Sequence, residues 1–265
     1  MNIQEIVTII RKLSILAGRE IMEVYASDDF GVDVKSDASP VTIADKRADA
    51  LIFKGLQAAF PDIAVVTEEQ AETHSKAHDR FFIVDPLDGT KEFIHKRGEF
   101  TVNIALVEEG IPVLGVVYAP AIGRLFITET GDHAVEELGP FDADVWGEKR
   151  PLAVTEKNEG ALNIVASKSH RDAATEAYIG KYDVDEFKAA GSSLKFCLLA
   201  SGEADLYPRL GRTMEWDTAA GHAVLRAAGG SVVRFDNHKD LIYGKDGFEN
   251  PFFIASNGQV DLKSS

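Results

Sequence analysis

Residues 81–90 read Phe-Phe-Ile-Val-Asp-Pro-Leu-Asp-Gly-Thr, an apolar run that ends in two aspartates and a threonine. The apolar run predicts a buried strand, and Pro86 and Gly89 indicate a turn immediately after it. Asp85 and Asp88 are therefore expected to project from the same strand end. Hard divalent cations prefer oxygen ligands, and Mg2+ is commonly held by a few carboxylates together with substrate phosphate oxygens. The segment thus favours a metal-dependent phosphate site.

Two other interpretations fit part of this segment. In an isolated Asp-x-x-Asp-Gly pattern the aspartates can simply cap a turn. Residues 87–90 also partly match the Asp-x-Asp-Gly-Thr loop of haloacid-dehalogenase phosphatases. That loop needs its nucleophilic aspartate two residues before Asp88, where this chain has Pro86. A covalent aspartyl-phosphate mechanism therefore has no nucleophile in the required place.

Further carboxylates follow other predicted elements. A short, mostly β-branched run at residues 63–66 is followed closely by Glu68 and Glu69. Far downstream, residues 216–218 open an Ala- and Leu-rich helix, with Asp217 at or next to its N-cap. Taken singly, Asp217 fits an ordinary helix cap and the two glutamates fit a solvated loop.

The order and spacing of these motifs resemble the signature of a known phosphatase group. The motifs are Glu68-Glu69, Asp85-Pro86-Leu87-Asp88-Gly89-Thr90 and Trp216-Asp217-Thr218-Ala219-Ala220-Gly221. Together they resemble the inositol monophosphatase superfamily of lithium-sensitive, Mg2+-dependent phosphatases. The resemblance spans nearly the whole chain, from an early Thr42-x-x-Asp45 element to the C-terminal helix.

This resemblance implies a fold and a cofactor. The fold is a layered α-β-α-β-α sandwich of the α/β (α+β) class, with the metal site where two halves of the chain meet. The cofactor is Mg2+, with two or three ions per site, Mn2+ able to replace it, and Li+ and Ca2+ as inhibitors. The implied metal ligands are four carboxylates and one backbone carbonyl: Glu68, Asp85, Asp88, Asp217 and Leu87.

The resemblance also implies three catalytic residues, Asp45, Thr90 and Glu69. Thr90 is expected to hydrogen-bond the attacking water, and Asp45 is expected to accept a hydrogen bond from Thr90. Glu69 is expected to act beside the metal ligands rather than as one of them. Clustered cations can neutralise the phosphate, activate a water and stabilise the departing alkoxide, so no protein nucleophile is required.

The second half of the chain carries the signals for the substrate. Residues 167–171, 191–197 and 207–209 resemble the CysQ-type 3'(2'),5'-bisphosphate nucleotidase branch, as does the run 35–42 before Asp45. The residues expected to bind substrate are Gly89, Ser169, His170, Ser192, Ser193, Lys195 and Arg209.

A substrate with two phosphates and a purine needs an anion site away from the metals. A helix that opens near Ser192 and Ser193 offers backbone N–H groups, hydroxyls and the cation of Lys195, and Arg209 adds a planar fork. His170 is expected to lie against the base or the ribose. Each residue also has an ordinary interpretation: a helix cap for Ser192, a solvated charge for Lys195, and a loop or surface position for the other two.

We therefore expect hydrolysis of adenosine 3',5'-bisphosphate to AMP and phosphate, with action on 3'-phosphoadenylyl sulfate as well, in sulfate assimilation. The alternatives are an inositol monophosphatase or inositol polyphosphate 1-phosphatase, and after these a sugar bisphosphatase. A non-catalytic metal- or nucleotide-binding regulator on the same fold is a remote alternative. Against it, the metal-binding carboxylates, Thr90 and Asp45 are all intact.

Composition limits the partners and the compartment. The chain has 265 residues, is 45% hydrophobic and carries a net charge of -15. It can bury a substantial core, and its acidity argues against nucleic-acid polymers as partners. No secretory leader or membrane span is expected, and the single cysteine, Cys197, suits a reducing cytoplasm. The resemblance adds peripheral association with the inner membrane, and the oligomeric state stays open.

Apolar spacing predicts the main elements. A long opening helix covers residues 3–24, a second helix begins near Asp45, and strands at 101–107, 113–118 and 124–128 form an antiparallel meander. Beyond residue 150, strands alternate with helices. The predicted strands there are 162–166, 184–187, 204–207, 231–235 and 252–255. The loop-rich stretch 139–150 is expected to divide the chain into halves, residues 1–145 and 146–265.

Overall fold

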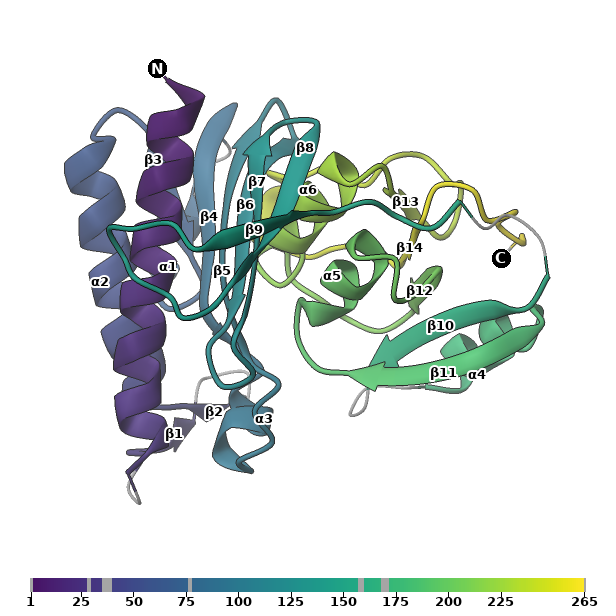
Figure 1. Ribbon diagram of the computed structural model, residues 1–265, viewed down its shortest axis with the longest axis horizontal. Coiled ribbons are helices and arrows are strands. Elements are labelled where there is room, and N and C mark those ends of the chain that lie inside the picture. Colours follow the sequence, from purple (N-terminus) through teal and green to yellow (C-terminus); the bar gives the residue numbers. More distant parts are fainter. Residues whose placement is uncertain are drawn as a thin grey trace.

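Two large β-sheets and the helices around them form alternating layers (Figure 1), and a two-stranded sheet accompanies them. The structure is a computed structural model that describes residues 2–27, 30–34, 40–75, 78–156, 160–167 and 172–264. Apolar side chains from both faces of each sheet form the cores between the layers. The expected α-β-α-β-α architecture is confirmed.

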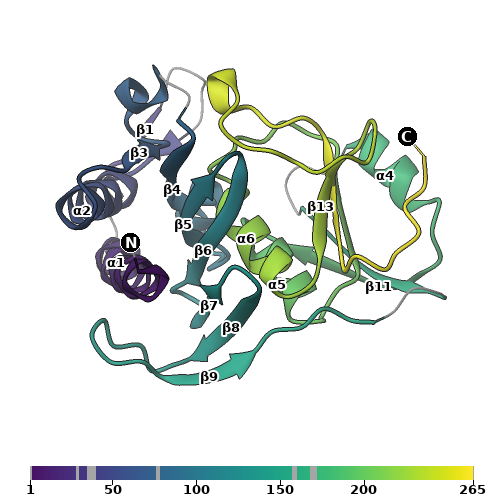
Figure 2. The same cartoon turned by 90° about the horizontal axis from the view of Figure 1, so that it is seen from above.

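Two long helices, α1 (Ile3–Tyr25) and α2 (Ile43–Ala59), cover the outer face of the larger sheet (Figures 1 and 2). Apolar residues recur along α1 at helical spacing, and Ile10 and Ile21 on this face are fully buried. Asn2 begins the helix, because its side chain accepts a hydrogen bond from the backbone of the first turn. Both predicted helices are therefore present.

The larger sheet has seven strands in sequential order. They are β3 (Ala64–Thr67), β4 (Arg80–Asp88), β5 (Thr101–Glu108), β6 (Ile111–Ala119), β7 (Arg124–Thr130), β8 (His133–Leu138) and β9 (Glu148–Pro151). The run from β4 to β9 is antiparallel, as the predicted meander requires, whereas β3 is parallel to β4. Parallel pairing places the carboxyl ends of β3 and β4 at one edge of the sheet.

The smaller sheet has the order β11-β10-β12-β14-β13. Its strands are β10 (Leu162–Ser167), β11 (Val184–Ala190), β12 (Leu206–Arg209), β13 (Ser231–Arg234) and β14 (Phe253–Ser256). The first three run parallel, and β14 is antiparallel to both of its neighbours. One face carries α4 (Ala173–Ile179), and the other faces the larger sheet.

Two short helices, α5 (Leu194–Ala200) and α6 (Ala219–Ala227), lie between the sheets (Figure 2). Gly115 on β6 permits this packing, because a Cβ there would lie 2.6 Å from the carbonyl oxygen of Ala220. The residues just before these two helices therefore lie where the two halves of the chain meet.

The remaining elements are short. They are β1 (Asp33–Val34), β2 (Pro40–Val41), α3 (Thr90–Ile94) and two 3-10 turns at Ala71–Ser75 and Asp246–Phe248. None of the helices in the described part of the chain is long and apolar enough to cross a bilayer.

The expected division at residue 145 falls before β9. Because β9 pairs with β8, the larger sheet continues to Pro151, and a division based on sheet membership lies after that residue. The strand predicted from residue 204 begins at Leu206, and the Asp205 side chain just before it accepts hydrogen bonds from Thr155 and the backbone of Asn163. The two halves as separate domains stay a prediction.

Candidate active site

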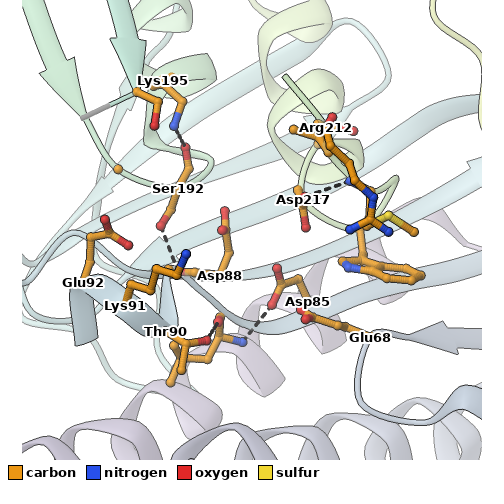
Figure 3. A pocket seen from close by; sticks show the side chains of 18 of the residues that line it. Glu68, Asp85, Asp88, Thr90, Lys91, Glu92, Ser192, Lys195, Arg212 and Asp217 are labelled. Atoms are coloured by element: carbon orange, nitrogen blue, oxygen red, sulfur yellow. Dashed lines mark hydrogen bonds between the residues drawn. The ribbon is translucent and has the colours of Figure 1, made fainter. Parts of the chain in front are cut away.

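Three carboxylates meet where the two halves of the chain join. Oxygen atoms of Glu68, Asp85 and Asp217 all lie within 4.8 Å of one another (Figure 3). Glu68 follows β3, and its N–H donates to the carbonyl of Val84 at 3.1 Å, so the parallel strand pair sets it beside Asp85. Asp217 arrives from the turn before α6.

The turn after Asp85 is shaped by its own side chain. The Leu87 N–H donates to Oδ1 of Asp85 at 3.0 Å, and the β4–β5 register shifts between Asp85 and Asp88. Gly89 then takes a φ of 94°, and a Cβ there would lie 2.4 Å from the Ser192 hydroxyl oxygen. Glycine is required because the second half of the chain packs directly against this turn.

Asp217 is not a helix cap. The N-cap of α6 is Thr218, and Oδ2 of Asp217 accepts instead from the N–H of Met214 at 2.8 Å. The side chain therefore closes the turn that precedes the helix, and one of its oxygens belongs to the carboxylate cluster. The capping interpretation of this residue is wrong.

Asp88 lines the same cavity but lies outside the three-residue cluster. Its Oδ2 accepts from the Asn103 amide at 3.4 Å. Burial raises the pKa of Asp88 to about 6; the Lys195 charge opposes this shift and the Glu68 charge adds to it. Burial, followed by the Asp88 and Glu68 charges, holds the pKa of Asp217 well above its usual range.

This donor set fits a hard divalent cation. Buried carboxylates that repel one another are costly as anions unless a cation compensates them. All the candidate ligand atoms are oxygens, which Mg2+ and Mn2+ prefer, and no histidine or cysteine belongs to the cluster among the described residues. Glu69 lines the cavity and is half-buried, but it is not part of the cluster.

Thr90 and Asp45 are hydrogen-bonded, as the sequence resemblance implied. The Thr90 hydroxyl lies 3.2 Å from Oδ1 of Asp45 and 3.4 Å from the carbonyl oxygen of Leu87. The other oxygen of Asp45 accepts from the backbone N–H and the hydroxyl of Thr42, at 2.7 and 2.6 Å, which closes a capping box at the start of α2. The helix start therefore fixes the orientation of Asp45 toward Thr90.

Two cationic side chains, Lys195 and Arg209, line the same cavity as the carboxylates. Lys195 is 5% exposed, and its ammonium group donates to the carbonyls of Ser192 and Ala190 at 2.6 and 3.4 Å. Burial lowers the pKa of Lys195 to about 8; the Asp88 charge opposes this shift and the Arg209 charge adds to it. Lys195 is therefore a buried cation and not a solvated one.

Arg209 is 9% exposed and also lines the cavity. Its Nη2 donates to the carbonyl of Arg212 at 3.0 Å, whereas its buried Nε has no hydrogen-bond partner among the described residues. Arg209 is not a surface residue. An unpaired buried donor beside a buried ammonium group is an environment that favours an anion.

The two serines behave differently from expectation. The Ser192 hydroxyl lies 2.8 and 2.9 Å from the carbonyl oxygens of Asp88 and Glu99, and the Ser193 hydroxyl donates to the carbonyl of Asp217 at 2.7 Å. Helix α5 begins only at Leu194, and neither hydroxyl caps it. Each hydroxyl therefore donates to a backbone carbonyl, and the Ser192 contacts join the two halves of the chain. A substrate-binding role for the two serines stays a prediction.

The carboxylates and the cations line one cavity of about 750 Å³. Sequence reasoning missed several of its lining residues, among them His74, Arg212 and Met214. The His74 ring stacks on Trp216 at 4.9 Å, and it lies in the short 3-10 turn Ala71–Ser75, which has no sequence motif. Ser169, His170 and the run 35–39 lie outside the described residues.

Comparison with known proteins places this cavity in a family. The model of the inositol monophosphatase family matches residues 2–261. The chain belongs to this family. Among its relatives, the 3'(2'),5'-bisphosphate nucleotidase CysQ of Escherichia coli strain K12 is 44% identical over 244 residues, which cover 91% of this chain and 95% of the relative.

Solved structures agree with this membership of the inositol monophosphatase family. CysQ from Bacteroides thetaiotaomicron superposes with a TM-score of 0.82 at 36% identity, covering 96% of this chain and 98% of the other. The inositol monophosphatase of Thermotoga maritima gives a TM-score of 0.75 at 28% identity, covering 94% and 91%. The expected family and fold are confirmed, and the chain is a phosphatase of the metal-dependent inositol monophosphatase family.

Proposed function

We propose that this family member is a Mg2+-dependent 3'(2'),5'-bisphosphate nucleotidase that hydrolyses adenosine 3',5'-bisphosphate to AMP and phosphate. We include 3'-phosphoadenylyl sulfate as a further substrate. One observation carries the substrate class: besides the carboxylates of Glu68 and Asp85, the cavity is lined by two buried cationic side chains, Lys195 and Arg209. The 44% identity to a nucleotidase of this name supports the same proposal.

The two buried cationic side chains support a substrate with two anionic groups. Burying Lys195 and Arg209 costs free energy unless partners compensate them. Lys195 donates hydrogen bonds to two carbonyls and lies over the Tyr207 ring, and the Asp88 charge compensates it in part. The Nε of Arg209 has no hydrogen-bond partner in the described part of the chain. A second phosphate would supply charge-assisted hydrogen bonds to both side chains. An inositol monophosphate has no second anionic group to place there.

The carboxylate cluster supports cations that hold the reacting phosphate. Two or three Mg2+ ions would be held by the side chains of Glu68, Asp85, Asp88 and Asp217 and the carbonyl of Leu87, with Mn2+ as a replacement and Li+ and Ca2+ as inhibitors. When bound, they would neutralise the phosphate, activate a water and stabilise the departing alkoxide. The cavity volume of about 750 Å³ lies within the range of small-ligand sites and leaves room for a nucleotide.

The side chains of Thr90 and Asp45 would orient the water. If the Thr90 hydroxyl donates to Asp45 at 3.2 Å, its own oxygen lone pairs remain to accept from a water in the cavity. Asp45, which is 1% exposed and fixed by Thr42, then takes up the proton-accepting role. Glu69 would act beside the ligands, since it lines the cavity without joining the cluster.

Residues 169 and 170, with Gly89, complete the proposed substrate-binding set. We place the reaction in the cytoplasm, in sulfate assimilation, with peripheral association with the inner membrane as an extension of this proposal. The substrate is a small nucleotide and no nucleic-acid polymer, which agrees with a net charge of -15. The lone cysteine, Cys197, is buried in the core and suits a reducing compartment.

The Lys195→Ala variant tests the second anion site. We expect kcat/KM for adenosine 3',5'-bisphosphate to fall about 10- to 100-fold, because a hydrogen bond to a charged group contributes about 1.5–3 kcal/mol. Adenosine 3'-monophosphate lacks the second phosphate, so its kcat/KM should change far less. Phosphate release from both substrates, measured in parallel, gives the comparison.

Lys188→Ala is the matched control, because Lys188 lies on β11 in the same half and bonds the carbonyl of Glu203 outside the cavity. It should leave both substrates unaffected. An equal loss for the two substrates in Lys195→Ala would show that Lys195 supports the fold of the turn and does not recognise the second phosphate.

A further inference from the structure

A second carboxylate in the Asp217 turn lies away from the cavity lining. Glu215 is fully buried, two residues before Asp217. It accepts hydrogen bonds from the backbone N–H groups of Gly244 and Lys245, at 2.6 and 3.0 Å. It also pairs with the Lys245 ammonium group at 2.5 Å, and Lys245 is 24% exposed. Burying a charged carboxylate costs desolvation free energy unless hydrogen-bond donors and a cation compensate it. The donors of Glu215 do so here.

These contacts belong to a larger set of hydrogen bonds between residues 242–250 and the same turn. The Glu215 N–H donates to the carbonyl of Phe248 at 2.7 Å. The Asn250 amide donates to the carbonyl of Met214 and the hydroxyl of Thr218, at 2.8 and 3.0 Å. The 242–250 segment therefore contacts the turn on both sides of Asp217.

The same segment reaches the larger sheet. The Tyr243 N–H donates to the carbonyl of Gly110 in the β5–β6 turn at 2.9 Å. A Cβ at Gly244 would lie 3.5 Å from the ring of Phe81. Phe81 lies on β4, the strand that carries Asp85. The 242–250 segment thus links β4, which carries Asp85, to the turn that carries Asp217.

We propose that Glu215 is a positioning residue: through Lys245 and the 242–250 segment it holds the Asp217 carboxylate at the distance from Glu68 and Asp85 that cation binding requires. The proposal rests on the metal-ligand role of Asp217 in the proposed function. Glu215 neither lines the cavity nor belongs to the carboxylate cluster, so its effect on a cation is indirect. Groups that orient metal ligands in this way typically change metal affinity or activity 10- to 100-fold when replaced.

The test is direct titration of the protein with Mn2+, without substrate. We expect Glu215→Gln to weaken Mn2+ binding about 10- to 100-fold, because glutamine cannot pair with Lys245 and cannot accept from both N–H groups as well. Lys245→Met should weaken binding in the same direction. The double variant should lose less Mn2+ affinity than the product of the two single losses, because both substitutions break the same Glu215–Lys245 pair.

Glu137→Gln is the matched control for stability. Glu137 is also fully buried and pairs with Arg11 at 2.6 Å, in contacts with α1 and the loop after β8. Its replacement should lower the thermal unfolding temperature of the metal-free protein and leave Mn2+ affinity unchanged. If Glu215→Gln also loses only thermal stability, Glu215 is structural and the proposal is overturned.

Three further outcomes are informative. If Glu215→Gln does not fold, Lys245→Met decides, since wild-type Mn2+ affinity in that variant would equally overturn the proposal. Unchanged Mn2+ affinity in Asp217→Asn would remove the metal-ligand role on which both this inference and the proposed mechanism depend. Unchanged affinity in Glu215→Gln and Lys245→Met, with loss in Asp217→Asn, would overturn only the positioning role.

Discussion

Replacing Asp85 with asparagine is expected to lower kcat/KM by about 10³-fold or more. Asp85 is 1% exposed at the centre of the carboxylate cluster, and a bound cation contributes several kcal/mol of charge stabilisation in the transition state. Asparagine removes the charge but keeps an oxygen that can accept from the Leu87 N–H, so the turn should persist. Phosphate release measured over a Mg2+ titration gives both the rate and the metal dependence.

Asp79→Asn is a suitable control for this result. Asp79 is exposed and lies next to the start of β4, at the opposite end of the strand from Asp85. Its replacement removes the same charge from the position just before this strand and should leave turnover and the Mg2+ requirement unchanged. An Asp85→Asn enzyme that kept a tenth of its activity with the wild-type metal requirement would exclude Asp85 as a ligand.

Thr90→Ala is expected to lower kcat by about 10²- to 10⁴-fold with little change in KM. The Thr90 hydroxyl lies 3.2 Å from Oδ1 of Asp45. Loss of a positioned proton-transfer group typically lowers the rate by about 10²- to 10⁴-fold. Because substrate binding depends on the cations and on Lys195, the loss should appear in kcat. Steady-state kinetics at saturating Mg2+ measure the two constants separately.

Thr90→Ser and Asp45→Asn complete the experiment. Serine keeps the hydroxyl and should retain most of the activity. Asparagine at residue 45 keeps one oxygen for the capping box with Thr42 but removes the proton acceptor, so it should resemble Thr90→Ala. Wild-type kcat in Thr90→Ala, or a pure KM effect, would contradict the assigned role.

The local parts of the fold were predictable from the sequence. The opening helix and the strands at 101–107, 113–118 and 124–128 have clear periods and glycine-containing turns, and all of them are present. The end of β4 was also predictable, because an apolar run is followed there by Pro86 and Gly89. The proximity of Glu68 to Asp85 was not, because parallel pairing of β3 with β4 is a non-local contact, and only the family resemblance implied it.

The roles of polar side chains in the second half were less predictable. Ser192 and Ser193 looked like anion donors because they precede a helix, but their partners are carbonyls more than 20 residues away in the sequence. Glu215 gave no signal, because its donors at 244–245 lie in a loop with no regular pattern. Burial of Lys195 also depends on packing between the sheets, which no local pattern encodes.

The proposed substrate is tested most directly by phosphate release from the unmodified enzyme with Mg2+, using adenosine 3',5'-bisphosphate and inositol 1-phosphate in parallel. We predict that kcat/KM for the nucleotide exceeds that for the inositol phosphate by a factor on the order of 100 or more, because a site built for a polar group rejects ligands that lack it. A preference for inositol 1-phosphate would leave the carboxylate site intact but contradict the assignment of Lys195 and Arg209 to a second phosphate.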